Sequence, residues 1–135
     1  MKRRHFLTIA AASAGASMVP LAAVADGFVD YRPGLIDEAL ARGETVFVDY
    51  GAVWCTTCAS QERTISALRE ANPAYDAAMT FIKVDWDTYR SAEVTKSRNI
   101  PRRSTLLVLR GEDELGRIVA GTSRRAIQEL MDLGL

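Results

Sequence analysis

Cys55 and Cys58 are the only cysteines in the 135-residue chain, and two residues separate them. They follow the apolar run of residues 45–50 and precede residues 59–71, a segment rich in helix formers, so the pattern predicts a strand-to-helix turn. Unpaired N–H groups and the positive end of the helix dipole stabilise a thiolate at such a turn. They lower the pKa of Cys55 from about 8.5 toward the range of reactive cysteines, roughly 3.5–7.5. The spacing therefore predicts a redox-active dithiol.

A structural disulfide is the alternative role for this pair, but a bridge that closes so short a loop removes little entropy from the unfolded chain. In the redox interpretation, the Cys55 thiolate attacks a substrate disulfide and Cys58 then attacks Cys55 to release the reduced substrate. Helical spacing places Cys58 on the core-facing stripe with Ile65 and Leu68. We therefore expect Cys55, at the helix tip, to be the more exposed thiol. The two intervening threonines do not indicate whether the dithiol is reducing or oxidising.

The elements that must position this pair follow from the hydrophobic pattern. In the first half of the chain we expect an edge strand within residues 26–31, a helix from Leu35 that Gly43 ends, a buried strand at 45–50, and the cysteine helix, which Asn72-Pro73 ends. In the second half we expect a strand at 80–84, a polar helix at 88–98 capped near Asp85, and a strand at 105–109. An antiparallel edge strand at 115–120 and a helix from near Ser123 complete the order. This order predicts an α/β fold: a central mixed sheet with helices on both faces.

Residues 1–25 are typical of a cleavable export signal. A basic start, Lys2-Arg3-Arg4, precedes a moderately apolar stretch, and Ala23-Val24-Ala25 supplies the small residues of a signal-peptidase site. An uncleaved membrane anchor is the alternative, which Gly15 and Pro20 disfavour. We therefore expect a mature domain of residues 26–135, soluble in the periplasm.

Arg3-Arg4 also resembles the twin-arginine export signal, although an ordinary secretory signal can hold the same pair. Removal of this segment leaves 14 basic and 17 acidic side chains, a net charge of −3. Nucleic-acid binding is disfavoured because it needs clustered positive charge.

Loss of the same segment removes His5, the only histidine. Histidine-dependent hydrolysis and histidine-ligated metal sites are therefore excluded for the mature domain. Two cysteines alone do not complete a zinc site within one chain, and a zinc site shared across a dimer is the alternative left open.

Three segments resemble thioredoxin, and the resemblance covers the chain from about residue 45 to residue 133. They are Val48-Asp49-Tyr50 followed by Trp54-Cys55-Thr56-Thr57-Cys58, Ile82-Lys83-Val84-Asp85, and Thr105-Leu106-Leu107-Val108-Leu109. Among relatives, the chain is most similar to exported thioredoxin-like reductases, in which a glutamate recurs four residues beyond the second cysteine, as Glu62 does here. The resemblance implies the thioredoxin fold.

Asp49 is an acid in an apolar strand, where an unpaired charge is costly to bury. The resemblance implies that it is a buried proton acceptor for Cys58; a solvated residue past the strand end is the alternative. Lys83 matches the family lysine beside that acid, or is an ordinary strand lysine. Glu62 shares the helical face of Cys58 at i+4, so it tunes the thiols or is simply solvated.

Trp54 is expected to pack beside the dithiol and shield it, or to fill the core. Thioredoxins place a cis-proline before the strand that faces the dithiol, and this chain departs from that pattern. Ser104 aligns with this proline when the chain is aligned without gaps. Pro101 aligns with it only if the chain carries a three-residue insertion. A cis bond before serine costs about 2.5–4 kcal/mol, so we expect a trans Pro101 and Ser104 opposite the cysteines. Arg103, with its neighbour Arg102, favours acidic partners or is merely solvated.

The sequence thus predicts an exported thiol–disulfide oxidoreductase that reduces envelope proteins and needs no cofactor or metal beyond the Cys55–Cys58 disulfide. Its expected partners are protein disulfides and an upstream membrane or envelope electron donor, and we expect a monomer. The alternatives are a disulfide oxidase or isomerase, and a Cu(I)-binding chaperone that uses both thiolates.

Overall fold

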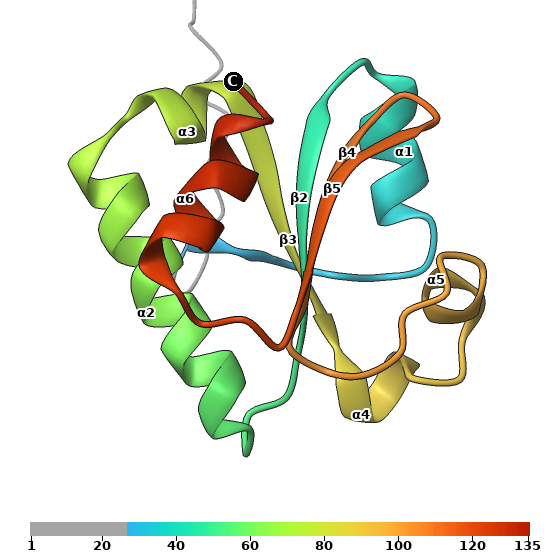
Figure 1. Ribbon diagram of the computed structural model, residues 1–135. Helices are drawn as coiled ribbons and strands as arrows, with labels where there is room; N and C mark the ends of the chain where they lie inside the picture. The colour runs from blue at the N-terminus through green and yellow to red at the C-terminus, as the bar shows by residue number, and fades with distance from the viewer. Residues whose placement is uncertain (1–26) are drawn as a thin grey trace, which may run out of the picture.

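The computed structural model describes residues 27–135, which form a five-stranded sheet with helices on both faces (Figure 1). The strand order is β1-β3-β2-β4-β5. The bounds of the strands are Val29–Asp30 for β1, Thr45–Gly51 for β2, Met79–Asp85 for β3, Thr105–Arg110 for β4 and Asp113–Val119 for β5. The predicted α/β fold is confirmed, because β1, β3 and β2 run parallel whereas β4 and β5 pair antiparallel.

Strand β2 lies at the centre of the sheet, and all seven of its residues are buried. Such a strand, covered on both faces, reads as a continuous apolar run, which is why its position was predictable. Its register sets Asp49 between Lys83 of β3 and Leu106 of β4. The strand therefore carries an acid into the middle of the sheet and ends directly before the cysteines.

Alternate residues of the strands build two hydrophobic cores, as the period of two requires. Phe47, Phe81 and Leu106 pack under α2 (Thr56–Ala71), α3 (Ala74–Ala78) and α6 (Arg124–Asp132). Val48 and Tyr50 pack on the opposite face with α1 (Leu35–Ala41). Figure 1 shows these two helical layers on either side of the sheet. Asp49 belongs to the α2 face because Phe47 does.

One predicted helix is wrong. Residues 88–98 form no continuous helix; instead α4 (Trp86–Tyr89) and α5 (Glu93–Lys96) are separated by a turn. Asp85 caps α4 as predicted, accepting from the Thr88 N–H at 3.1 Å. The Thr95 hydroxyl donates to the Tyr89 carbonyl between the two helices. Such side-chain bonds to the backbone compete with helix formation in a segment that has little apolar periodicity.

The other differences are at element boundaries. Residues 74–78, between the cysteine helix and the next strand, form the short helix α3, and β5 begins at Asp113, two residues earlier than predicted. The predicted signal segment, including Arg3 and Arg4, lies outside the described residues. No helix within residues 27–135 is long and apolar enough to cross a membrane.

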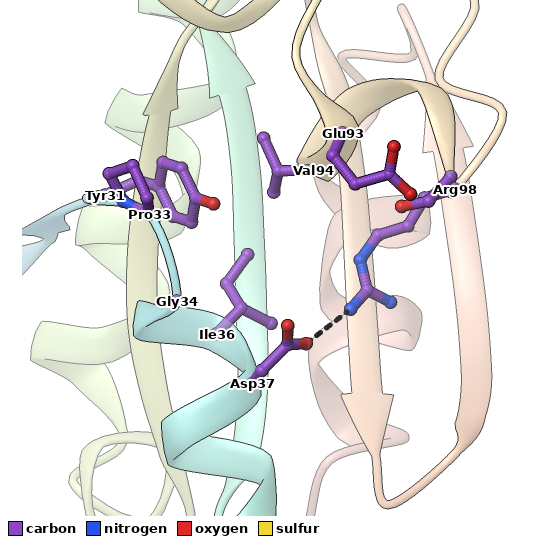
Figure 2. A pocket seen from close by; sticks show the side chains of 9 residues that line it. Tyr31, Pro33, Gly34, Ile36, Asp37, Glu93, Val94 and Arg98 are labelled. Atoms are coloured by element: carbon purple, nitrogen blue, oxygen red, sulfur yellow. Dashed lines mark ion pairs between the residues drawn. The ribbon is translucent and has the colours of Figure 1, made fainter.

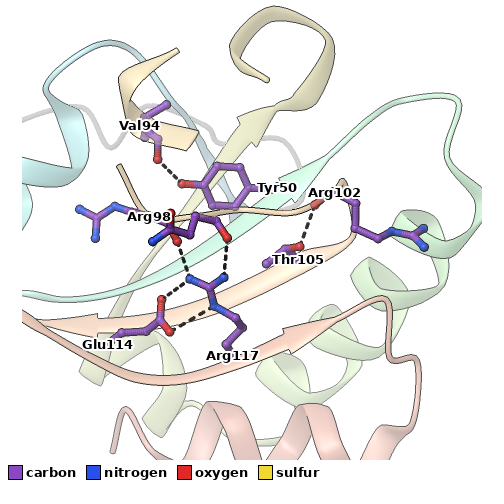
Figure 3. A network of polar contacts seen from close by, with 8 residues as sticks. Tyr50, Val94, Arg98, Arg102, Thr105, Glu114 and Arg117 are labelled. Atoms are coloured by element: carbon purple, nitrogen blue, oxygen red, sulfur yellow. Dashed lines mark hydrogen bonds and ion pairs between the residues drawn. The ribbon is translucent and has the colours of Figure 1, made fainter. Parts of the chain in front are cut away.

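Polar contacts anchor the loop between α5 and β4 (Figure 3). Arg117 of β5 donates to the carbonyls of Arg98 at 2.6 Å and Asn99 at 2.9 Å. The Thr105 hydroxyl donates to the Arg102 carbonyl at 2.7 Å. This loop ends at Ser104, so the network fixes the backbone that leads into that residue.

Candidate active site

The two cysteines lie where β2 passes into α2. Cys55 is the N-cap of α2, and its Sγ accepts a hydrogen bond from the Cys58 N–H at 3.2 Å. A sulfur in this position receives both a backbone donor and the positive end of the helix dipole. Both cysteines are free thiols. The predicted placement at a strand-to-helix turn is confirmed.

Both thiols are buried, and Cys55 is the more exposed of the two, as expected. Cys55 is 4% exposed and Cys58 is fully buried, so the predicted order holds but the difference is small. They pack with Ala52 and with Trp86 of α4.

Ser104 lies against both sulfurs. Its Oγ is 3.3 Å from Cys55 Sγ and 3.1 Å from Cys58 Sγ. No peptide bond within residues 27–135 is cis, and Pro101 is exposed. The predicted arrangement, with Ser104 opposite the cysteines and a trans Pro101, is confirmed.

The backbone of Ser104 has a φ of 63°, in the left-handed region that non-glycine residues rarely adopt. Three hydrogen bonds hold it there. Its N–H donates to the Tyr50 carbonyl at 2.7 Å, and its carbonyl accepts from the Ala120 N–H at 2.9 Å and from Gln61 Nε2 at 3.0 Å.

Gln61 is a site residue that the sequence analysis missed. It is fully buried on α2, and its amide also donates to the Gly121 carbonyl at 2.9 Å. The signal was its spacing, because it lies three residues after Cys58 and four before Ile65, on the core-facing stripe. A polar residue on such a stripe needs a buried partner, which Ser104 supplies.

The two thiols have opposite pKa shifts. Burial alone would raise the pKa of Cys55, but hydrogen bonds from Cys58, Ser104 and the Arg103 side chain lower it to about 7. Burial raises the pKa of Cys58, and the neighbouring Cys55 raises it further. At neutral pH the pair therefore consists of a partly ionised Cys55 and a protonated Cys58.

Asp49 is fully buried, and neither carboxylate oxygen has a hydrogen-bond partner among the described residues. Burial raises its pKa to about 7, and the Glu62 charge raises it while Lys83 lowers it. The alternative of a solvated aspartate at the strand end is thus wrong. A carboxyl with this pKa exchanges a proton readily near neutral pH.

Gly51 lets Asp49, Glu62 and Cys58 converge. A Cβ on Gly51 would lie 3.3 Å from Asp49 Oδ1, 3.6 Å from Glu62 Oε1 and 3.7 Å from Cys58 Cβ. Glu62 also forms an ion pair with Lys83 at 2.5 Å, and both side chains are about three-quarters buried. The structure therefore brings the predicted acid, glutamate and lysine together beside Cys58.

Trp54 does not fill the core, so that alternative is wrong, and its shielding of the dithiol stays a prediction. Its side chain is 55% exposed, its indole N–H donates to Asp87 Oδ2 at 2.8 Å, and the Arg103 guanidinium lies 4.5 Å from the ring centre. The partly buried Trp86 packs against the cysteines. Trp54 and Arg103 form the rim of the site.

Other surfaces are separate from the dithiol. A cavity of about 220 Å³ lies between α1 and α5, where Asp37 and Arg98 are 3.7 Å apart (Figure 2). Neither cysteine lines it. Within residues 27–135 no three His, Cys, Asp or Glu side chains cluster as a metal site would require.

The five-stranded sheet and the Cys-x-x-Cys pair at a helix N-terminus define a dithiol domain of the thioredoxin class. The thioredoxin family model matches residues 34–133. The chain therefore belongs to the thioredoxin family, whose members include thiol–disulfide oxidoreductases. No curated protein sequence matches the chain at a significant level.

Several solved structures are similar. Trxlp from Edwardsiella tarda EIB202 is 31% identical, with a TM-score of 0.64 over 75% of this chain and 96% of that one. The reduced thioredoxin pre-protein of Schistosoma mansoni is 22% identical, with a TM-score of 0.64 over 80% and 98% of the two chains. Thioredoxin NaTrxh from Nicotiana alata is 19% identical, with a TM-score of 0.60 over 76% and 88%. The last two likenesses show the fold alone.

Proposed function

We propose that the chain is an exported thiol–disulfide oxidoreductase that reduces disulfides of other envelope proteins. The observation that carries the proposal is the asymmetry of the dithiol. Cys55 Sγ is the N-cap of α2 with a pKa of about 7, while Cys58 has a raised pKa and lies beside the buried Asp49. One thiol is poised to attack and the other is held back with a base near it.

The reaction uses these residues in sequence. The Cys55 thiolate attacks one sulfur of the substrate disulfide, forms a mixed disulfide, and expels the other sulfur as a thiolate. Asp49 accepts the Cys58 proton, and Cys58 Sγ then attacks Cys55 Sγ. The products are a Cys55–Cys58 disulfide and a fully reduced substrate, and an upstream donor returns two electrons to the protein.

The reducing direction is supported by the absence of a large insertion between the strands of the described chain. Dedicated oxidants of this fold usually carry a large helical insertion. In residues 27–135, only the four-residue helices α4 and α5 lie between β3 and β4. Export is supported by the basic and apolar pattern of residues 1–25.

The reduction potential of the Cys55–Cys58 pair tests the direction. We expect it at or below the cytosolic glutathione potential, about −220 to −260 mV, when the mature domain is equilibrated with a reference dithiol. A potential well above that range would overturn the reductase proposal in favour of an oxidase or isomerase. Stoichiometric Cu(I) binding without disulfide exchange would favour a copper chaperone.

The substrate is found by trapping. Replacing Cys58 with Ser removes the resolving thiol, so mixed disulfides on Cys55 accumulate in the native envelope. Capture of envelope proteins by Cys58→Ser, but not by the matched Cys55→Ser variant, would support the proposal. Capture by neither variant would overturn it.

A further inference from the structure

Ser104 is, within residues 27–135, the one side chain outside the pair that makes hydrogen-bond contact with both sulfurs. Its Oγ is 3.3 Å from Cys55 Sγ and 3.1 Å from Cys58 Sγ. All three atoms belong to buried residues, so water does not compete freely for these contacts. The hydroxyl therefore touches both reacting atoms of the dithiol.

A serine hydroxyl has one proton to donate and lone pairs that accept, and it rotates to suit its partners. It therefore donates to only one sulfur at a time. When Cys55 is the thiolate, the hydroxyl donates to Cys55 and accepts from the Cys58 S–H. When Cys58 is the thiolate, the same hydroxyl rotates and donates to Cys58.

We propose that Ser104 is a catalytic residue whose hydroxyl donates its hydrogen bond first to the Cys55 thiolate and then, after the mixed disulfide forms, to the Cys58 thiolate. This inference rests on the proposed thiol–disulfide exchange and adds to it a residue that stabilises both nucleophiles. The hydrogen bond follows the negative charge from one sulfur to the other.

The steps balance without transfer of the serine proton. In the first, the Cys55 thiolate forms a bond to a substrate sulfur, the substrate S–S bond breaks, and the charge leaves on the expelled thiolate. In the second, the Cys58 proton moves to Asp49, Cys58 Sγ bonds to Cys55 Sγ, and the second substrate sulfur leaves with the electron pair. Ser104 donates one hydrogen bond in each step and keeps its proton.

The surrounding structure is built to hold this hydroxyl in place. The positive φ of Ser104 is a strained conformation, and such strain persists only where the surroundings over-determine it. Three hydrogen bonds to its backbone, from Gln61 and Ala120 and to Tyr50, supply that constraint. Arg117 holds the preceding loop through the carbonyls of Arg98 and Asn99 (Figure 3).

The first half of the proposal is tested by the pKa of Cys55, measured from the ultraviolet absorbance of the thiolate during a pH titration. Ser104→Ala and Ser104→Gly both remove the hydroxyl, and glycine adopts a positive φ freely. We expect both to raise the pKa of Cys55 by about one, a tenfold loss of thiolate below that pKa. An unchanged pKa in both variants would overturn this half.

Two controls separate the hydroxyl from general structural damage. Ser123→Ala removes another hydroxyl, the N-cap of α6, which accepts from the Ala126 N–H. It is expected to lower the melting temperature without moving the pKa of Cys55. Ser104→Thr keeps a hydroxyl, but its β-branched side chain disfavours a positive φ. In a variant that keeps the wild-type melting temperature, it is expected to restore the pKa of Cys55 toward that of the wild type. If Ser104→Ala does not fold, the glycine variant carries the test.

The second half is tested by the resolving step alone. Cys55 is converted to its mixed disulfide with thionitrobenzoate, and release of the coloured thiol reports attack by Cys58. We expect release about tenfold slower in Ser104→Ala and Ser104→Gly at neutral pH. A rate equal to that of the wild type would overturn this half. If the wild type reduced no protein disulfide, the proposed function would fail, while these two measurements would still decide the role of Ser104.

Discussion

The two cysteines of the dithiol have different neighbouring side chains. Toward β4, Cys55 contacts the Ser104 hydroxyl and the Arg103 side chain, whose guanidinium lies against the exposed Trp54 ring. Toward β3, Cys58 meets the carboxyls and lysine gathered around Gly51. Burial raises the pKa of both thiols, but at Cys55 the hydrogen bonds outweigh it and the pKa is lowered, whereas at Cys58 they do not and the pKa is raised. Two identical side chains thus acquire the unequal roles of attack and resolution from their neighbours.

The largest expected effect comes from removing each of the two thiols in turn. Cys55→Ser removes the thiol with the lowered pKa, so we expect complete loss of attack on a small disulfide probe. Cys58→Ser keeps the first attack and loses only turnover, because the resolving thiol is gone. Single-turnover release of a chromophoric leaving thiol distinguishes them. Attack by Cys58 in the Cys55→Ser variant at a comparable rate would refute the asymmetry.

The raised pKa of Asp49 predicts how the stability of the protein depends on pH. Between about pH 4 and pH 7 the folded protein holds a proton on Asp49 that the unfolded chain has released. The folded state binds more protons there, so stability falls as pH rises, by on the order of 4 kcal/mol for an aspartate whose pKa rises to about 7. Above pH 7 this penalty is constant. Denaturant unfolding measures the slope, which Asp49→Asn should remove.

Cys55 should give a slope of opposite sign at higher pH. Its folded pKa of about 7 lies below the ordinary cysteine pKa of about 8.5, so between these values the unfolded chain binds more protons and stability rises with pH. Oxidation to the disulfide removes this titration. A rise of equal size in the reduced and the oxidised protein would contradict the assignment to Cys55.

Asp49→Asn is the next test because it leaves the Cys55 side intact. If Asp49 accepts the Cys58 proton, we expect the resolving step to slow about 100-fold at neutral pH, a typical loss for a general base. The first attack by Cys55 should keep its rate within a few-fold. A pH profile of disulfide reduction identical to that of the wild type would show that Asp49 is not the proton acceptor.

Glu62→Gln and Lys83→Met offer a matched pair with smaller effects. Both break the same ion pair, but Glu62 raises the pKa of Asp49 whereas Lys83 lowers it. We therefore expect changes of about 0.5–1 in the pKa of Asp49, downward for Glu62→Gln and upward for Lys83→Met. Carboxyl titration by NMR measures both. Shifts of the same sign would indicate a structural rather than an electrostatic effect.

The smallest expected effect on the thiols is that of Trp54→Ala. Because this ring is exposed and does not contribute to the lowered pKa of Cys55, that pKa should change by no more than about 0.3, less than the effect of one surface hydrogen bond. The KM for a protein disulfide should rise about threefold from the lost contact area. A large rise in the pKa of Cys55 would support the shielding role that the sequence predicted.

The periodicity of the apolar residues predicted the strands and the helix that hold the dithiol. Continuous apolar runs gave β2 and β4, the spacing of Cys58, Ile65 and Leu68 oriented α2, and Asp49 stood out as an acid in an apolar strand. The resemblance to thioredoxins put Ser104 opposite the cysteines, and the cost of a cis bond before serine correctly predicted a trans peptide there. These signals are local, so one chain segment carries each of them.

The remaining features depend on contacts between distant segments. The packing of Trp86 against the dithiol depends on how α4 lies at the end of β3, which the sequence alone does not show. The role of Gln61 becomes visible only when Ser104 and Gly121 are brought to α2. The break between α4 and α5 follows from competition between side-chain and backbone hydrogen bonds, which a weakly periodic segment does not reveal.

Because β2 is central, the dithiol has a strand on each side, and the substrate and the proton acceptor can meet it from different sides. Ser104 precedes β4 on one flank of β2, while Lys83 lies on β3 on the other, where Val53, Lys83 and Asp85 line an open cavity. Lys83 is also ion-paired with Glu62, whose charge raises the pKa of Asp49. In the proposed reaction the substrate disulfide meets Cys55 on the side of Ser104, whereas the charged groups that act on the proton acceptor lie on the side of β3. Substrate binding and proton transfer would then use opposite flanks of a single strand.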